Sequence, residues 1–199
     1  MAITAGMVKE LREMTGAGMM DCKKALTATD GDMDKAVEYL REKGLSAAAK
    51  KADRVAAEGV VYAVADAAKK VGAIIEVNSE TDFVAKNADF NAFVAQCAQI
   101  IMEQNPADVD ALLACKTENG MTVEELLREK ILVIGENLKI RRFVREEGTL
   151  ATYIHAGGKI GVMVKFDVSD GIADKAEFVE CGHDVAMQIA AINPGLPEA

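Results

Sequence analysis

The chain has 199 residues, 50% of them hydrophobic, which is enough for one large domain or two to three small ones. Its formal net charge of −9 argues against direct binding of nucleic acid, because such binding needs clustered lysine and arginine. The longest apolar stretches, residues 60–65 and 71–77, are too short to span a bilayer, and the first residues lack the features of a secretory signal. We therefore expect a cytoplasmic protein (or one of an organelle matrix, if it is processed) that binds neither nucleic acid nor a membrane.

Residues 1–45 are predicted to form three short helices. Thr4 is a candidate N-cap, and the run Thr-Gly-Ala-Gly at 15–18 separates the first helix from a second over 19–27. Gly44 is a candidate stop for the third helix. The apolar side chains at helical spacing are Met7, Val8, Leu11, Met14, Cys22, Leu26, Ala36, Val37 and Leu40. Three helices with tight glycine turns resemble the ubiquitin-associated (UBA) type of module, a small partner-binding head.

Residues 46–57 are rich in alanine and lysine, which have high helix propensity, so we expect a helical linker here. The charge also changes at this linker. Residues up to Arg54 are nearly neutral, whereas the rest of the chain is strongly acidic. An acidic body with a near-neutral head is typical of a protein that docks on another protein.

The body of the chain contains an internal repeat. The matching segments are 58–59 with 147–148, 71–77 with 160–166, 89–90 with 177–178, and 105–106 with 193–194. The offset is 89 residues for the first two matches and 88 for the last two, as one deletion would produce. An offset this constant indicates duplication.

Each copy is predicted to contain a strand, a turn, a second strand, a loop and a helix. The first copy, 58–146, continues with a helix over 123–133 and a strand over 138–144. The second copy, 147–199, ends shortly after its helix, so we expect it to be incomplete. The predicted fold class is α+β, with a three-helix head followed by a duplicated core of antiparallel strands and packed helices.

No motif for catalysis or cofactor binding is found in the sequence. The glycines form neither a phosphate-binding loop nor a dinucleotide fingerprint, and there is no nucleophile elbow. The four cysteines, Cys22, Cys97, Cys115 and Cys181, lack metal-ligand spacing, and only two histidines accompany them. We expect buried reduced thiols, no metal, no cofactor and no enzymatic activity.

The segment 79–84, Ser-Glu-Thr-Asp-Phe-Val, lies between a predicted strand and a predicted helix. One interpretation is a helix cap, in which Thr81 or Asp82 accepts backbone N–H bonds and Phe83 folds back on the core. The repeat favours a different interpretation, because the equivalent stretch 168–172 has no aromatic residue. Since loops on rigid scaffolds carry function, this difference indicates a role for Phe83 beyond packing.

Met19 and Met20 are adjacent in the second predicted helix, so they cannot both face the same small core. We expect at least one of them to present an adaptable apolar surface to a partner. The alternative is a pair of core methionines at a turn.

Three motifs resemble those of the elongation factor Ts family. The first covers 11–26 and includes Thr-Gly-Ala-Gly-Met-Met-Asp at 15–21. The second covers 76–85 and includes Thr-Asp-Phe-Val-Ala at 81–85, and the third begins Ile-Gly-Glu-Asn-Leu at 134. The three motifs occur in the family's order, and the resemblance covers essentially the whole chain.

The resemblance implies a guanine-nucleotide exchange factor that promotes GDP release from the GTPase elongation factor Tu. It also implies a three-helix module before a duplicated core, and the chain lacks the helical hairpin and C-terminal module of the long family members, so we expect a truncated form. The implied partner contacts are Met19, Met20 and Lys23 in the head, Thr81, Asp82, Phe83 and Val84 in the loop that enters near the bound Mg²⁺, Ile134 and Gly135 close to it, and Tyr153 and His155 on a distant domain of the GTPase.

Two other functions are compatible with parts of the sequence. An adaptor with a UBA-like head and an inert body would bind ubiquitin-like or nascent-chain partners without any effect on nucleotides. An enzyme using Cys97 or Cys181 with His183 would show turnover that is sensitive to thiol reagents. Neither alternative explains why an aromatic residue is present in one copy of the repeat and absent from the other.

Overall fold

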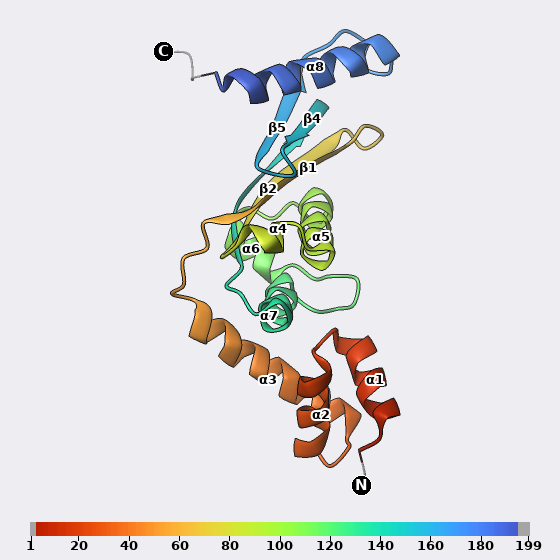
Figure 1. Cartoon of the computed structure of the whole chain (residues 1–199). Helices are drawn as coiled ribbons and strands as arrows, with labels where there is room; N and C mark the ends of the chain where they lie inside the picture. The colour runs from red at the N-terminus through yellow and green to blue at the C-terminus, as the bar shows by residue number, and fades with distance from the viewer. Residues whose placement is uncertain (1–2, 195–199) are drawn as a thin grey trace. The chain divides into compact units, whose positions relative to one another are not determined.

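The computed structural model describes residues 3–194, which contain eight helices and five strands (Figure 1). The mixture of helices with two antiparallel sheets confirms the predicted α+β class. The chain divides into two compact units. The N-terminal unit contains the chain up to Ala56 together with Lys116–Leu138, and the sheet unit contains Ala57–Cys115 and the chain from Lys139 onward. Within the described residues, no helix combines the length and apolar character needed to cross a membrane.

The N-terminal unit is helical. It consists of α1 (Ala5–Thr15), α2 (Met19–Ala28), α3 (Met33–Lys51) and α7 (Val123–Ile134). Thr4 caps α1 through its side chain, as predicted, and the turn after α1 passes through a left-handed glycine. Among the first three helices, the buried core residues are Val8, Leu11, Ala17, Cys22, Ala25, Leu26, Ala36 and Leu40.

The prediction that Gly44 ends the third helix is wrong. Helix α3 continues through Gly44 to Lys51, so only the first part of the predicted linker 46–57 is helical. A Cβ atom at Gly44 would lie 3.6 Å from the backbone oxygen of Arg128 in α7, an ordinary van der Waals distance, so Gly44 lies at the contact between the two helices. The sequence did not separate these roles, because a glycine after a lysine fits a helix stop as well as a helix contact.

The helix predicted over 123–133 is confirmed as α7, but it packs on α3 in the N-terminal unit and not with the strands that lie on either side of it in the sequence. A capping box formed by Thr122 and Glu125 fixes its N-terminus. Burial raises the pKa of the Glu129 carboxyl group on this helix, and the nearby Arg41 of α3 partly offsets the increase. Glu129 is therefore held in an environment that disfavours its ionised form.

Replacing Glu129 by glutamine is expected to raise the melting temperature at pH 7. The pKa of Glu129 is higher in the folded than in the unfolded chain, so its contribution to stability is present at low pH and is lost as the pH rises through the folded value. Glutamine avoids this loss, and the gain should therefore shrink towards pH 4. The matched control is Glu124→Gln, whose exposed carboxylate pairs with Arg128 on the same helix. Equal pH dependence in both variants would contradict the assignment.

The sheet unit contains a three-stranded antiparallel sheet of β1 (Glu58–Asp66), β2 (Val71–Ser79) and β3 (Lys139–Glu147), in that order. Near the start of β1 the backbone needs a glycine: Gly59 has φ +134°, and a Cβ atom there would lie 2.2 Å from the carbonyl oxygen of Val77. This close approach fixes the end of the β1–β2 hairpin from which the following loop leaves.

Three helices follow β2: α4 (Asp82–Ala85), α5 (Ala88–Gln104) and α6 (Val109–Ala114). The predicted helix over 89–104 is confirmed as α5, which packs against β1 and β2. Asn87 caps it by accepting a hydrogen bond from the backbone N–H of Phe90. The largest fully buried side chains of α5 are Phe90, Phe93, Ile101, Val94 and Cys97.

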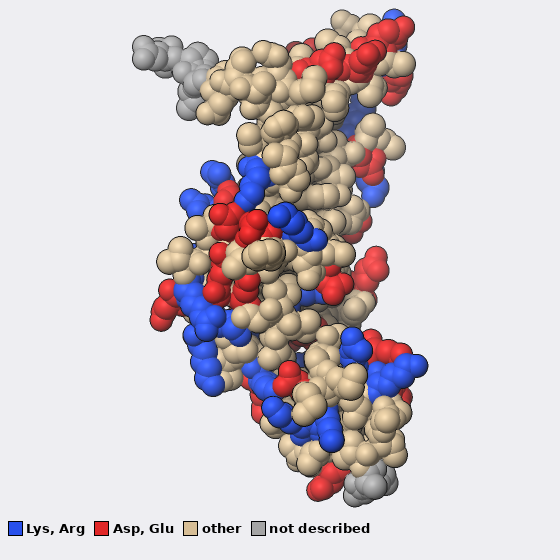
Figure 2. Space-filling model, viewed as in Figure 1, with Lys and Arg blue, Asp and Glu red and all other residues tan. Residues whose placement is uncertain are grey.

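The rest of the sheet unit is a hairpin of β4 (Thr149–His155) and β5 (Ile160–Phe166), followed by α8 (Ala176–Ile192). Helix α8 packs along both strands of this hairpin, and the hairpin contacts β1 (Figure 1). The rings of Phe166 and Phe178 meet edge to face with centroids 5.3 Å apart, which joins β5 to α8. In the space-filling view, this part of the unit has a largely uncharged surface with a band of acidic side chains near one end of α8 (Figure 2).

Candidate functional site

The segment after β2 forms a short, well-supported helix. Ser79 is fully buried, and its hydroxyl donates to the carbonyl oxygen of Thr81 at 2.9 Å. Thr81 is the N-cap residue in an extended conformation, and the four residues of α4 follow it. Val84 is buried, so this one side chain anchors the helix to the sheet unit.

Phe83 points away from the core. Its exposed fraction is 78%, so the interpretation in which it folds back on the core is wrong. Asp82 precedes it and forms an ion pair with Lys86, one helical turn later, at 3.4 Å. An exposed aromatic ring next to an exposed carboxylate, on a helix anchored by Val84, is a surface feature suited to a partner.

The predicted residues Ile134 and Gly135 end helix α7. Gly135 is the C-cap in the left-handed conformation, with φ +86°, and its N–H donates to the carbonyl oxygen of Ile131. Ile134 is half-buried and Gly135 is exposed. The motif therefore forms a glycine-terminated helix end in the N-terminal unit.

Met19 and Met20 are both exposed, at 61% and 63%, so the alternative of two core methionines is wrong. They are the first two residues of α2, and Lys23 is exposed one turn further along. Cys22 is the buried anchor of this turn, and Asp21 forms an ion pair with Lys43 of α3. These contacts leave two flexible apolar side chains and one cation free to face a partner.

Met14 was predicted to belong to the core face of the first helix, but it is 60% exposed. It lies in the last turn of α1, directly before the turn that leads to Met19. Val8 and Leu11 on the same helix are buried and Met7 packs against the same core, so of the four predicted side chains only Met14 was placed wrongly. The signal that could have identified Met14 is the clustering of three methionines around one glycine turn.

Tyr153 and His155 lie on β4 and contact each other. The tyrosine hydroxyl and Nδ1 of His155 are hydrogen-bonded at 3.0 Å. The ring of His183 on α8 packs edge-on against Tyr153 with centroids 5.4 Å apart. Both histidines of the chain therefore contact Tyr153. The contact of His183 was not predicted from the sequence.

The turn after His155 lies near the base of the loop that carries Phe83. The N–H of Val61 donates to the carbonyl oxygen of Gly158 at 2.7 Å, and Lys159 forms an ion pair with Glu58. Glu58 is opposite Ser79 in the β1–β2 register. The end of β4 and the start of the Phe83 loop therefore lie at the same end of the sheet unit.

Within residues 3–194, no three His, Cys, Asp or Glu side chains are grouped so that they could hold a metal ion. Burial raises the pKa of the Cys97 thiol to about 12, so it supplies almost no thiolate at neutral pH. This contradicts a nucleophilic role for Cys97. The prediction that all four thiols are buried is wrong for Cys181, which is exposed, and only partly right for Cys115.

Labelling with a thiol reagent at pH 8 is expected to show one fast-reacting cysteine in the folded chain. Cys181 is exposed, whereas burial raises the pKa of Cys22, Cys97 and Cys115. Absorbance of the released thiolate would measure the rates, and Cys181→Ser should remove the fast phase. A fast phase that persists in this variant would contradict the burial of the other three.

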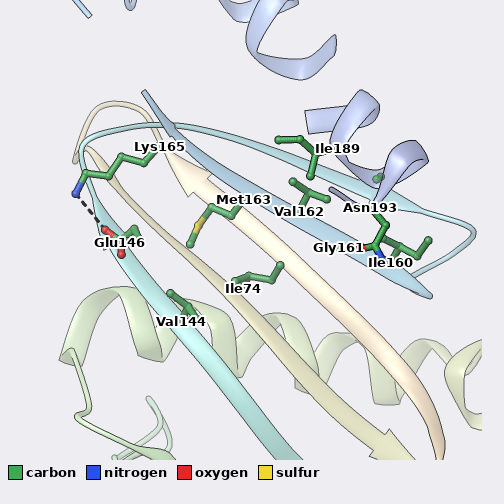
Figure 3. Close-up of a pocket in the computed structure, with 11 residues that line it drawn as sticks. Ile74, Val144, Glu146, Ile160, Gly161, Val162, Met163, Lys165, Ile189 and Asn193 are labelled. Atoms are coloured by element: carbon green, nitrogen blue, oxygen red, sulfur yellow. Dashed lines mark hydrogen bonds and ion pairs between the residues drawn. The ribbon is translucent and has the colours of Figure 1, made fainter. Parts of the chain in front are cut away.

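An open apolar cavity of about 780 Å³ lies beside β5 (Figure 3). Ile74 of β2, Val162 and Met163 of β5 and Ile189 of α8 contribute to its lining, and Lys165 pairs with Glu146 at one end at 3.1 Å. None of the predicted site residues lines it. It is therefore separate from the candidate site.

Comparison with known proteins decides the family. A sequence model described as Elongation factor TS matches residues 80–197, more than half of the chain. The chain belongs to the elongation factor Ts family. Elongation factor Ts of Clostridium perfringens strain 13 is 54% identical over 195 residues, and that of Clostridioides difficile strain 630 is 53% identical over 194. Each match covers 96% of this chain and 63% of the relative.

Elongation factor Ts of Trichlorobacter lovleyi is 52% identical over 201 residues, covering 98% of this chain and 64% of the relative. The chain thus spans somewhat less than two thirds of the length of the elongation factor Ts relatives it matches. These matches confirm the resemblance that the three motifs indicated.

Proposed function

We propose that this chain binds the GTPase elongation factor Tu and accelerates release of GDP from it, without covalent chemistry of its own. The family membership supports a role in translation elongation. The observation that carries the proposal is the 78% exposure of Phe83 on α4, a helix whose neighbouring residue Val84 is buried. An aromatic ring held outward in this way can enter a pocket on a partner with little loss of conformational freedom.

The proposed mechanism acts on the supports of the nucleotide in the partner. Backbone N–H groups and a bound Mg²⁺ ion would hold GDP in the GTPase by compensating the charge of its phosphates. Phe83 would insert near this site as a wedge, and Asp82 would either position the ring or change the environment of the ion. Loss of the ion's supports leaves phosphate charge uncompensated, and this favours release.

The energies are of the right order for this mechanism. A thousandfold acceleration requires about 4 kcal/mol of preferential binding to the transition state for release. Burial of one aromatic side chain in a partner pocket supplies about 2–3 kcal/mol. The remainder would come from other contacts that improve as the nucleotide site opens, for which Thr81, Ile134 and Gly135 are the candidates.

The other predicted residues would provide affinity. Met19, Met20 and Lys23 would dock the head on the nucleotide-binding domain, and Tyr153 and His155 would contact a distant domain of the GTPase. Contacts that are equally strong before and during release change affinity and leave the maximal release rate unchanged. The proposal therefore separates residues that dock from the residue that acts as the wedge.

Release of a fluorescent GDP analogue from elongation factor Tu, with and without the chain, tests the proposal. We expect the release rate to rise with chain concentration towards a maximum. Binding without acceleration would contradict the wedge role and leave the docking role in place. Absence of binding would contradict both the docking and the wedge roles.

We also infer that the part of the chain after the linker arose by duplication, with copies 58–146 and 147–199. A UBA-like head over 1–45 and a linker over 46–57 precede them. Helix α5 shifted by 88 residues coincides with α8, and both helices end in a left-handed asparagine, Asn105 or Asn193. Gly59 and Gly148, 89 residues apart, have φ values of +134° and +131°. Such agreement of backbone detail supports a shared origin.

A further inference from the structure

Asparagine side chains lie on both sides of helix α4, one near the end of strand β2 and one on helix α5. At its entrance, Asn78 is 8% exposed, and its Nδ2 donates to the carbonyl oxygen of Glu58 across the hairpin at 3.0 Å. At its exit, Nδ2 of Asn91 donates to the carbonyl oxygens of Ala85 and Asn87, both at 2.9 Å. Asn78 thus fixes the end of the hairpin from which the segment leaves, and Asn91 ties the end of α4 to α5.

The helix between them needs this support. It has four residues, too few to be stable as an isolated helix. Its C-terminal turn is closed by the N–H groups of Lys86 and Asn87, which donate to the carbonyls of Phe83 and Val84 at 3.2 and 2.9 Å. Ala85 is the last residue of α4, and Asn87 is the N-cap of α5. The side chain of Asn91 therefore bonds to the end of one helix and to the start of the next.

The second repeat copy lacks both asparagines. Under the offset of 89 residues Asn78 corresponds to Asp167, and under the offset of 88 Asn91 corresponds to Val179. In the described chain no helix lies between β5 and α8, and no aromatic residue occurs in this connection. The two asparagines, the short helix and the exposed aromatic ring therefore occur together in one copy and are absent together from the other.

We infer that Asn78 and Asn91 are positioning residues for Phe83. By fixing α4 before a partner arrives, they keep the ring in one orientation, so that less freedom is lost when it enters the partner. The effect falls on the release step, because docking uses other side chains. This inference rests on the proposed exchange function.

Asn91 is the better residue to test, because its side chain is exposed and its removal leaves no cavity in the core. The experiment measures release of the GDP analogue from elongation factor Tu as a function of chain concentration for Asn91→Ala, Phe83→Ala and the double variant. We expect Asn91→Ala to lower the maximal release rate about three- to tenfold, with less than a twofold change in the half-saturating concentration. In the Phe83→Ala background the same substitution should have no further effect.

The control is Gln99→Ala, an exposed position on the same helix that bonds only to Glu103 among the described side chains. It should change neither parameter. Amide hydrogen exchange at Lys86 and Asn87 gives a second readout, and Asn91→Ala should speed exchange at both.

If Asn91→Ala lowered the maximal release rate by the same factor with and without Phe83, the positioning role would be overturned, since a general structural effect does not depend on the ring. Unchanged release and unchanged amide protection would overturn it as well. If the unmodified chain fails to accelerate release, the proposed function itself fails. The amide exchange would then still show whether Asn91 orders α4, which separates the two failures.

Discussion

Phe83→Ala is expected to lower the maximal rate of GDP release from elongation factor Tu by about 30- to 160-fold, the equivalent of about 2–3 kcal/mol of lost aromatic burial. The loss should appear in the rate and much less in the affinity, because in the proposed mechanism the ring contributes most when the nucleotide site is opening. Phe83 is 78% exposed in the free chain, so its removal leaves the core intact. The folded chain should therefore keep its melting temperature.

Stopped-flow fluorescence of a labelled GDP analogue measures both parameters, and circular dichroism confirms the fold of each variant. The matched control is Val179→Ala, an apolar side chain in the same unit with an exposed fraction of 61%. It should alter neither rate nor affinity. A proportional loss of affinity and maximal rate in Phe83→Ala would mean that the ring is only a docking contact.

Comparison of the repeat copies predicted a role for Phe83 beyond packing, whereas local patterns alone left open whether the ring is buried or exposed. A helix of four residues has no periodicity from which an outward face can be read. Whether Phe83 faces the core or the solvent depends on Val84. Val84 takes the buried position of this helix, so Phe83 points outward. The hydrogen bonds of the Asn91 side chain could not be predicted from the sequence either, because they depend on the angle between α4 and α5.

Regular elements were predicted more reliably than the contacts between them. The strands and the helix over 89–104 followed from hydrophobic runs and caps, which are local signals. The continuation of α3 through Gly44 and its packing on α7 depend on residues more than 80 positions away, near Arg128. From the sequence alone, a glycine at a contact between two helices cannot be distinguished from a glycine that ends a helix, because the partner helix is not known.

Replacing Met19 and Met20 together by alanine is expected to weaken binding to elongation factor Tu by about 10- to 100-fold while leaving the maximal release rate within about twofold. Burial of each methionine side chain at an interface would contribute up to about 1.5 kcal/mol to the free energy of binding. Both are exposed by more than 60% in the free chain, so the substitution removes little packing from the head. Isothermal titration calorimetry gives the affinity, and the fluorescence assay at saturating concentrations gives the rate.

Met14→Ala tests whether this apolar surface extends across the glycine turn to α1. Its exposed fraction of 60% matches those of Met19 and Met20, so a shared surface predicts a further loss of affinity. Met187→Ala, on α8 in the other unit and 41% exposed, is the control for a general effect of losing a surface methionine. If Met19→Ala with Met20→Ala lowered the maximal rate as much as Phe83→Ala does, docking and release would be one event, and the division between them would have to be given up.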